Sequence, residues 1–119
     1  MSGLVAAAVA GNAAFAEQYA AFRSEAHEAL GEELTAHVRH AVGQVHGLES
    51  DAPPGEVPAA ILAYAKRIPF EHTAITDAEA AEVVEAIGEK GYVALSVVAA
   101  LADAECRAER VDLAGLSAT

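Results

Sequence analysis

The chain has 119 residues, of which 18 are Asp or Glu and 7 are Lys or Arg, so its formal net charge at pH 7 is -11. A length of this order corresponds to one domain, which we place at residues 1–119. Such an acidic balance argues against a protein that binds a phosphate backbone or an anionic membrane surface through clustered Lys and Arg. We therefore expect no nucleic acid and no membrane among its partners.

The cysteine content limits the redox chemistry of the chain. Cys106 is the one cysteine, which excludes an intrachain disulfide and a metal site built from paired cysteines. A single thiol and no secretory pattern predict a cytoplasmic protein. Residues 4–16 are apolar, but the stretch is too short and too rich in alanine to span a bilayer.

The composition favours helices. Apolar residues make up 54% of the chain, and many of them are alanine, the strongest helix former. Val and Ile are scattered singly, without alternation of period two, so no strand is predicted. We predict an all-α bundle of about five to six helices. Because alanine gives each helix little apolar bulk to bury, we also expect the chain to associate with copies of itself.

The first helix is predicted over residues 4–27, with a weak point at Gly11 where the helix breaks or bends. Phe15, Tyr19 and Phe22 recur at spacings of four and three residues. This spacing places the three rings on one face of the helix.

The second helix is predicted over residues 32–46, with an apolar stripe that ends before Gly47. Residues 48–55 contain two adjacent prolines, a glycine and two acids, and this composition predicts a loop. A third helix is predicted over residues 56–67. We expect Pro69 to close it, because proline cannot continue the backbone hydrogen bonds of a helix.

The fourth helix is predicted to begin after Thr76, which forms a capping box with Glu79. Gly88 or Gly91 is expected to end it. The fifth helix, over residues 92–110, is apolar nearly all round in its first half. Such a segment is typical of the middle of a bundle or of an oligomer interface.

The densest set of ionisable side chains lies on the second helix. Glu33, His37 and His40 follow one another at spacings of four and three, so they project from one side of the helix, beside its apolar stripe. One interpretation is a divalent metal bound by the two imidazoles and the carboxylate. A second is metal-free proton transfer, with His37 as the base and Glu33 orienting it. A third is a solvated helix edge with a weak pair between Glu33 and His37.

The remaining nucleophilic and basic candidates have structural explanations. His46 and His27 each lie near the end of a predicted helix, where the helix dipole favours a histidine. His72 lies in a predicted loop and is expected to be exposed. Cys106 has arginines nearby that favour a thiolate, but it shares a face with alanine and leucine, so we expect a buried and inert thiol.

The helix pattern resembles a known family. The run AGNAAFAEQYAAFRSEAHEALGEELTAHVRHAVGQVHG (residues 10–47) resembles the first half of the carboxymuconolactone decarboxylase/alkylhydroperoxidase-like superfamily, including the turn that ends in Val45-His46-Gly47. Residues 75–116 are similar to the closing helix pair of that family. The resemblance covers about residues 10–116 and implies an all-α, alkylhydroperoxidase-like bundle that assembles as a trimer or hexamer.

The redox motif of the peroxidase branch is missing. When the chain is aligned on its Val45-His46-Gly47 turn, Ala36 stands where the family has its Glu, Leu48 and Asp51 stand at its two cysteines, and Gly55 stands at its His. A thiol peroxidase forms a thiolate and a disulfide. The resemblance therefore implies a member without thiol peroxidase activity.

The decarboxylase branch of the family needs no cysteine pair, and its helical histidine resembles His37 in Thr35-Ala36-His37-Val38-Arg39. This resemblance implies that His37 handles a proton and that Arg39 binds a substrate carboxylate; a solvent-facing Arg39 is the alternative. We expect a small-molecule enzyme without cofactor or metal. Its acid/base chemistry, decarboxylase-like or isomerase-like, would use His37, His40 and Glu33. The other hypothesis is a non-catalytic helical oligomer that binds a ligand or a protein partner.

Overall fold

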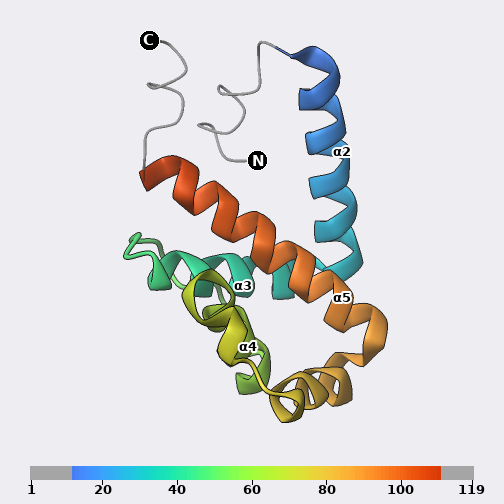
Figure 1. The fold of residues 1–119 in the computed structure, drawn as a ribbon, viewed down its shortest axis with the longest axis vertical. Helices are drawn as coiled ribbons and strands as arrows, with labels where there is room; N and C mark the ends of the chain where they lie inside the picture. The colour runs from blue at the N-terminus through green and yellow to red at the C-terminus, as the bar shows by residue number, and fades with distance from the viewer. Residues whose placement is uncertain (1–11, 111–119) are drawn as a thin grey trace.

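The computed structural model describes residues 12–110, and all regular structure in this range is helical (Figure 1). It contains four α-helices and one short 3₁₀ helix: α2 (Ala13–Leu30), α3 (Glu32–Val45), α4 (Ala59–Glu71), η1 (His72–Ala74) and α5 (Asp77–Arg110). The predicted all-α class is confirmed for these residues. Within residues 12–110 there are four α-helices where the prediction for the whole chain was five to six, because the fourth and fifth predicted helices run together as α5. Residues 4–11 of the first predicted helix lie outside the described residues.

Helix α5 is the central element, because it packs against α2, α3 and α4. Figure 1 shows it crossing the molecule diagonally, with the other helices arranged around it. The largest fully buried side chains come from α3, α4 and α5: Val38, Val42, Ile61, Val83, Leu95 and Val98. Burial of an aliphatic side chain of this size contributes about 1.5–3 kcal/mol to folding. One face of the apolar first half of the fifth predicted helix, with Leu95 and Val98, therefore lies in the core, whereas Val93 on another face is 60% exposed.

A single glycine explains why two predicted helices form one element. Gly88 has φ 80° and ψ 171°, which is not a helical conformation, and it divides α5 into two segments that meet at a kink. The helix that was predicted to end at Gly88 or Gly91 thus changes direction at Gly88, and the next helix follows without an intervening loop. Only glycine adopts this backbone conformation without strain, since a Cβ would clash with the neighbouring peptide groups.

The helix starts follow the sequence signals. The Asn12 side chain accepts a hydrogen bond of 2.9 Å from the amide of Phe15, which caps α2. The Thr76 hydroxyl accepts one of 3.2 Å from the amide of Glu79, and the Glu79 carboxylate lies 3.4 Å from the amide of Thr76. The predicted capping box is therefore confirmed, and it begins α5.

Pro69 does not close its helix, so that prediction is wrong. Helix α4 begins at Ala59 and continues through Pro69 to Glu71. Pro69 lacks an N–H, but its own carbonyl accepts a hydrogen bond of 2.6 Å from Nη2 of Arg107 on α5. Pro69 is also buried. A tertiary contact thus stabilises a turn that the local sequence predicts to be broken.

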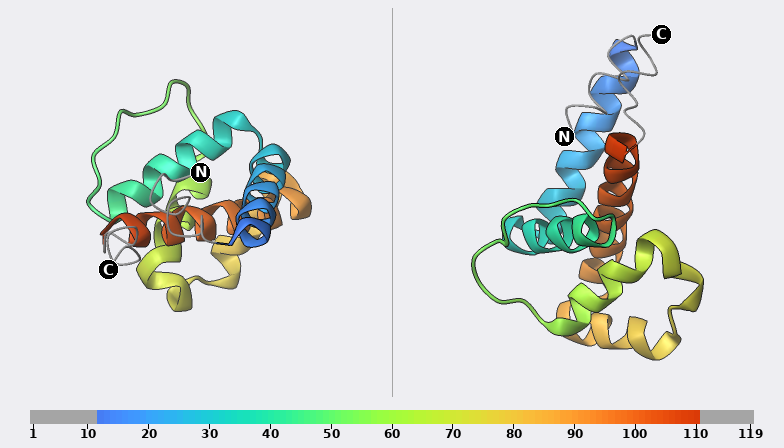
Figure 2. Two further views of the ribbon diagram at one scale, coloured as in Figure 1. Left: turned by 90° about the horizontal axis from the view of Figure 1, so that it is seen from above. Right: turned by 90° about the vertical axis from the view of Figure 1, so that its left-hand side faces the viewer.

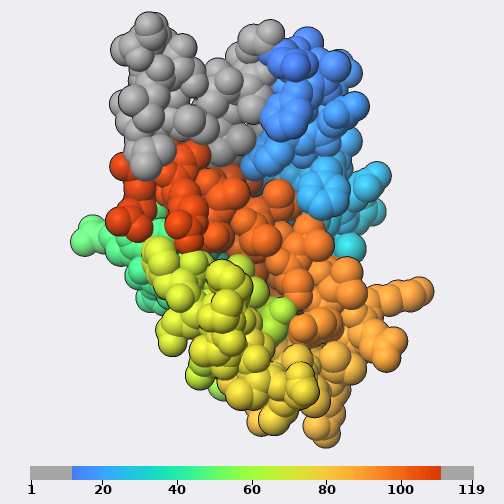
Figure 3. Space-filling model, in the orientation of Figure 1, coloured from blue at the N-terminus to red at the C-terminus, as the bar shows by residue number. Residues whose placement is uncertain are grey.

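Two segments shape the surface. Residues 46–58 form the α3–α4 loop, which contains the predicted loop over residues 48–55. Figure 2 shows this loop swinging out from the helices, and Figure 3 shows α2 as a column along one side of the molecule. None of the helices between residues 12 and 110 combines the length and the apolar character that crossing a membrane requires.

We predict opposite effects of alanine at two glycines. Gly88→Ala should lower the free energy of unfolding by about 1–3 kcal/mol, because φ 80° with ψ 171° strains any residue with a Cβ. Gly43→Ala lies inside α3, where an added Cβ has nothing within 4 Å, so it should raise that free energy by about 0.5–1 kcal/mol. Urea unfolding followed by circular dichroism measures both. Equal stability of the two variants would contradict the kink at Gly88.

Candidate functional site

The polar edge of α3 faces the α3–α4 loop. Nε2 of His37 lies 3.1 Å from the carbonyl oxygen of Pro54, and Nδ1 of His40 lies 2.7 Å from the hydroxyl of Ser50. The Glu33 carboxylate lies against Gly55, so closely that a Cβ added there would be 2.8 Å from Oε1. The three side chains predicted to form one site thus each contact a different part of the loop.

These contacts bear on the three interpretations of the α3 edge. The structure records no hydrogen bond or ion pair between Glu33 and His37 within residues 12–110. Across the same residues, no three His, Cys, Asp or Glu side chains gather closely enough to hold a metal ion. The side chains of the metal interpretation therefore do not converge on one point, and the edge serves instead to hold the loop.

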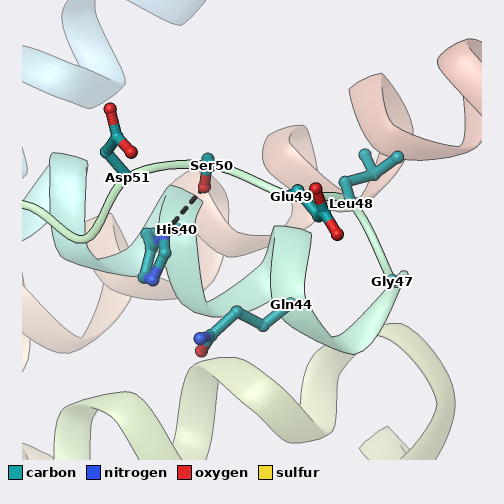
Figure 4. A pocket seen from close by; sticks show the side chains of 7 residues that line it. All are labelled: His40, Gln44, Gly47, Leu48, Glu49, Ser50 and Asp51. Carbon is teal, nitrogen blue, oxygen red and sulfur yellow. Dashed lines mark hydrogen bonds between the residues drawn. The ribbon is translucent and has the colours of Figure 1, made fainter.

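His40 lines two adjoining hollows beside this loop. The first has a volume of about 780 Å³, and its lining runs from α3 into the loop (Figure 4): His40, Gln44, Gly47, Leu48, Glu49, Ser50 and Asp51. Figure 4 shows the His40 ring turned toward Ser50 on the loop. The second hollow, of about 430 Å³, lies between α3, the loop and the C-terminal part of α5. We call this second one the α3–α5 hollow.

Of the four predicted site residues, Arg39 and His40 line the α3–α5 hollow, whereas Glu33 and His37 do not. The hollow is also lined by Glu105 and Cys106 from α5. Glu33 lies instead beside residues 53–55, at another hollow. The structure therefore places Arg39 and His40 together, and it adds a carboxylate and a thiol that the motif analysis did not connect with them.

A buried carboxylate ties three helices together at this hollow. Glu105 is only 4% exposed. Its carboxylate accepts hydrogen bonds of 2.8 and 3.2 Å from Nε and Nη2 of Arg23 and one of 2.6 Å from the Tyr19 hydroxyl, both on α2. Nη2 of Arg39 on α3 lies 3.6 Å away. We call these four residues the Glu105 cluster.

The Glu105 cluster sets the protonation of its members. Burial alone raises the pKa of Glu105, but the hydrogen bonds from Arg23 and Tyr19 and the charges of both arginines outweigh it and hold that pKa below its ordinary value of 4.5. Burial, and then the nearby Glu105 carboxylate, raise the pKa of the Tyr19 hydroxyl well above its usual range. At neutral pH, Glu105 is therefore ionised and Tyr19 is a neutral donor.

Cys106 is less buried than predicted and lines the α3–α5 hollow. It is half-buried, and burial raises the pKa of its thiol. The carboxylates of Glu109, Asp103 and Glu105 raise it further, in that order. The thiol is therefore protonated at neutral pH, and a protonated thiol is a poor nucleophile.

From the sequence, His46 is explained by its position near a helix end, but in the structure its side chain has partners on α5. It is the C-cap residue of α3, and its side chain is fully buried. Nε2 lies 2.7 Å from Oδ1 of Asp103, and Nδ1 lies 3.3 Å from Nη1 of Arg110, both on α5. Since the arginine N–H can only donate, Nδ1 accepts and Nε2 donates to Asp103. His46 thus joins the end of α3 to α5.

His72 is exposed, as predicted, but it lies in the 3₁₀ helix η1 and not in a loop.

The motif analysis missed Glu105, Tyr19 and Arg23 as members of one cluster. Glu105 lies 86 residues from Tyr19 and 82 from Arg23, so no local spacing connects them. One signal was present: Glu105 continues the spacing of buried positions on α5 that includes Leu95 and Ala102. A charged residue on a buried helix face requires a partner of opposite charge.

The resulting site has two parts, the α3–α5 hollow, which is lined by Arg39 and His40, and the Glu105 cluster, which also includes Arg39. Glu105 belongs to both. Residues 1–119 match no protein-family model, no curated protein and no solved structure. The functional assignment below therefore rests on the residues, their geometry and the resemblance drawn from the sequence.

Glu105→Gln should reduce the stability of the fold in a pH-dependent way. Removing the charge leaves Arg23 buried without its partner, which should lower the free energy of unfolding at pH 7 by about 3 kcal/mol. Because the pKa of Glu105 is lowered on folding, its stabilising effect is complete above about pH 4.5 and is lost as the pH falls through its folded value. The wild type should therefore lose more stability than the variant on acidification.

Urea unfolding at pH 7 and at several values below pH 4.5 tests this. The control is Glu109→Gln, an exposed residue one turn further along α5, which should differ from wild type by less than about 0.5 kcal/mol. A Glu105→Gln variant with the same acid dependence as wild type would contradict the role given to the cluster.

Proposed function

We propose that this protein is a cofactor-free enzyme that acts on a small carboxylic acid in the α3–α5 hollow, with Arg39 binding the carboxylate and His40 transferring a proton. The observation that carries the proposal is that Arg39 and His40 line the same hollow. An anion-binding group and a proton-transfer group beside one space are the minimum for acid/base chemistry on a carboxylic acid. The resemblance to the decarboxylase branch supports decarboxylation or isomerisation as the reaction class.

The hydrogen bond between His40 and Ser50 favours His40 as the proton-transfer group. An imidazole that donates from Nδ1 to the Ser50 hydroxyl, over 2.7 Å, carries its lone pair on Nε2 and can act there as a base. The Ser50 contact also fixes the orientation of the ring. In a decarboxylation, Nε2 of His40 first takes up a proton from solvent. The carboxylate then leaves as CO₂, the electron pair of the broken C–C bond stays on the adjacent carbon, and protonated His40 delivers its proton to that carbon.

Arg39 has capacity for a ligand. Its side chain is 45% exposed, and its contact with Glu105 is a long one of 3.6 Å. Glu105 already accepts three shorter hydrogen bonds from Tyr19 and Arg23, so it does not require Arg39. A substrate carboxylate can therefore approach the guanidinium and accept two parallel hydrogen bonds.

In this proposal, His37 and Glu33 are positioning residues. Their contacts with Pro54 and Gly55 hold the loop against α3. That loop supplies Leu48, Glu49, Ser50 and Asp51 to the wall of the hollow. We therefore assign proton transfer to His40 and give His37 the role of keeping the wall in place.

We predict that His40→Gln strongly slows the reaction while His37→Gln preserves most of it. The probe substrate is carboxymuconolactone, the compound that gives the superfamily its name, and the measurement is CO₂ release. His40→Gln should lower kcat/KM by about 100-fold or more, since a proton-transfer group contributes about 10²–10⁴-fold. Arg39→Gln should raise KM more than it lowers kcat. Absent CO₂ release by wild type, or equal losses in the two histidine variants, would contradict the assignment.

A second candidate function is self-association through α2, with or without catalysis. Phe15 and Phe22 are each 51% exposed, although both are large apolar side chains and lie two turns apart on one helix. Tyr19, between them, instead points inward to Glu105. Exposed aromatic side chains at this spacing are typical of a helix that packs against a further surface.

Native mass spectrometry tests this second candidate. Wild type should be an oligomer, and the double substitution Phe15→Glu with Phe22→Glu should shift it toward monomer, because two carboxylates cannot be buried unpaired in an apolar interface. Val93→Glu is the control, since Val93 is 60% exposed but lies on α5. A monomeric wild type, or equal dissociation of the control, would exclude α2 as the contact surface.

A further inference from the structure

A separate hollow lies between α2 and α3 and shares Arg39 with the α3–α5 hollow. Figure 1 shows the two helices meeting at one end and diverging. The space between them has a volume of about 720 Å³ and is lined by Arg23, His27 and Arg39. We call it the α2–α3 crevice. It brings two guanidinium groups and one imidazole to a common space, and none of the roles assigned above uses His27.

The two arginines of the crevice share one buried carboxylate. Arg23 and Arg39 carry two positive charges, whereas Glu105, the carboxylate paired with both, carries one negative charge. Arg39 remains 45% exposed, but the Glu105 side chain is only 6% exposed. The Arg39 guanidinium therefore keeps hydrogen-bond donors that a dissolved ion can reach.

His27 reports the effect of these charges. Burial lowers its pKa, and the positive charges of Arg23 and then Arg39 lower it further, although the Glu105 carboxylate acts in the opposite direction. At neutral pH the imidazole is therefore neutral. An anion bound in the crevice would compensate both arginines and would favour the protonated imidazole.

We propose that the α2–α3 crevice binds a small oxyanion, a phosphate or a carboxylate, through Arg39 and Arg23 with His27 as the third group. Arg39 offers the exposed donors, and the planar guanidinium matches the spacing of two oxygens on either anion. Protonated His27 adds a charge-assisted hydrogen bond. The Ser24 and Thr35 hydroxyls also line the crevice.

Two acidic side chains limit the affinity of this site. Glu28 and Glu32 line the same crevice and are exposed, so their charges repel an anion but are screened by solvent and salt. We therefore expect the crevice to bind its anion weakly, with the affinity typical of a metabolite that exchanges with solution and not that of a tightly held cofactor. The same repulsion provides a second test, because removing one of these negative charges should strengthen anion binding, whereas removing Arg39 should weaken it.

The proposal is independent of the catalytic role of His40, although both involve Arg39. An anion in the crevice contacts Arg39 from the α2 side, whereas the proposed substrate contacts it from the α5 side. His40 lines only the latter space. The His40→Gln variant should therefore bind phosphate as wild type does, even if its catalytic role is wrong.

The experiment is an NMR titration of the histidine side chains in the full chain, with sodium phosphate or sodium acetate as the probe and sodium chloride at equal ionic strength as the reference. The pKa of His27 should rise with phosphate or acetate in a saturable way, and the anion with the larger rise identifies the preferred source. His72, exposed on η1, is the internal control and should not respond.

Two exposed positions provide variants that keep the buried ion pair intact. Arg39→Gln should weaken anion binding by about tenfold or more, as expected for loss of a charge-assisted pair. Glu32→Gln should strengthen it by a few-fold. The proposal is overturned if the pKa of His27 does not change, if His72 responds equally, or if Arg39→Gln binds as wild type does.

Discussion

The buried carboxylate of Glu105 is the constraint on which the arrangement of three helices depends. A carboxylate that is 4% exposed is stable as an ion only when opposite charge and hydrogen-bond donors surround it. Arg23 and Tyr19 supply these from α2, and Arg39 supplies a longer contact from α3. The position of α2 against α5 therefore depends on a charge pair in addition to the apolar packing of Ala26 and Leu30.

The same constraint creates the two spaces beside Arg39. Because Glu105 is satisfied by α2, the guanidinium of Arg39 is held in place by one long contact and keeps most of its donors available. It lines both the α3–α5 hollow with His40 and the α2–α3 crevice with His27. The proposed catalysis and the proposed anion binding are thus two uses of one side chain.

The local features of this chain were predictable and the distant ones were not. The bounds of α3, the loop with two prolines and the capping box at Thr76 follow from short sequence signals, because each depends on neighbours within four residues. The passage of α4 through Pro69 depends on Arg107, 38 residues away. The α3 edge was recognised as polar, but its contacts with the loop depend on how the loop folds back, which no spacing on the helix reveals.

The pairing of Glu105 with α2 also affects how the chain folds during synthesis. Its partners, Tyr19 and Arg23, are made 86 and 82 residues before it, so α2 leaves the ribosome long before the residue that holds it exists. Until then its arginine and aromatic side chains stay hydrated or contact other surfaces. The closing of so long a segment is entropically unfavourable and is completed late. We therefore expect the docking of α2 against α5 to be the last step of folding. In a nascent chain that stops before Glu105, α2 should not yet be packed against the other helices.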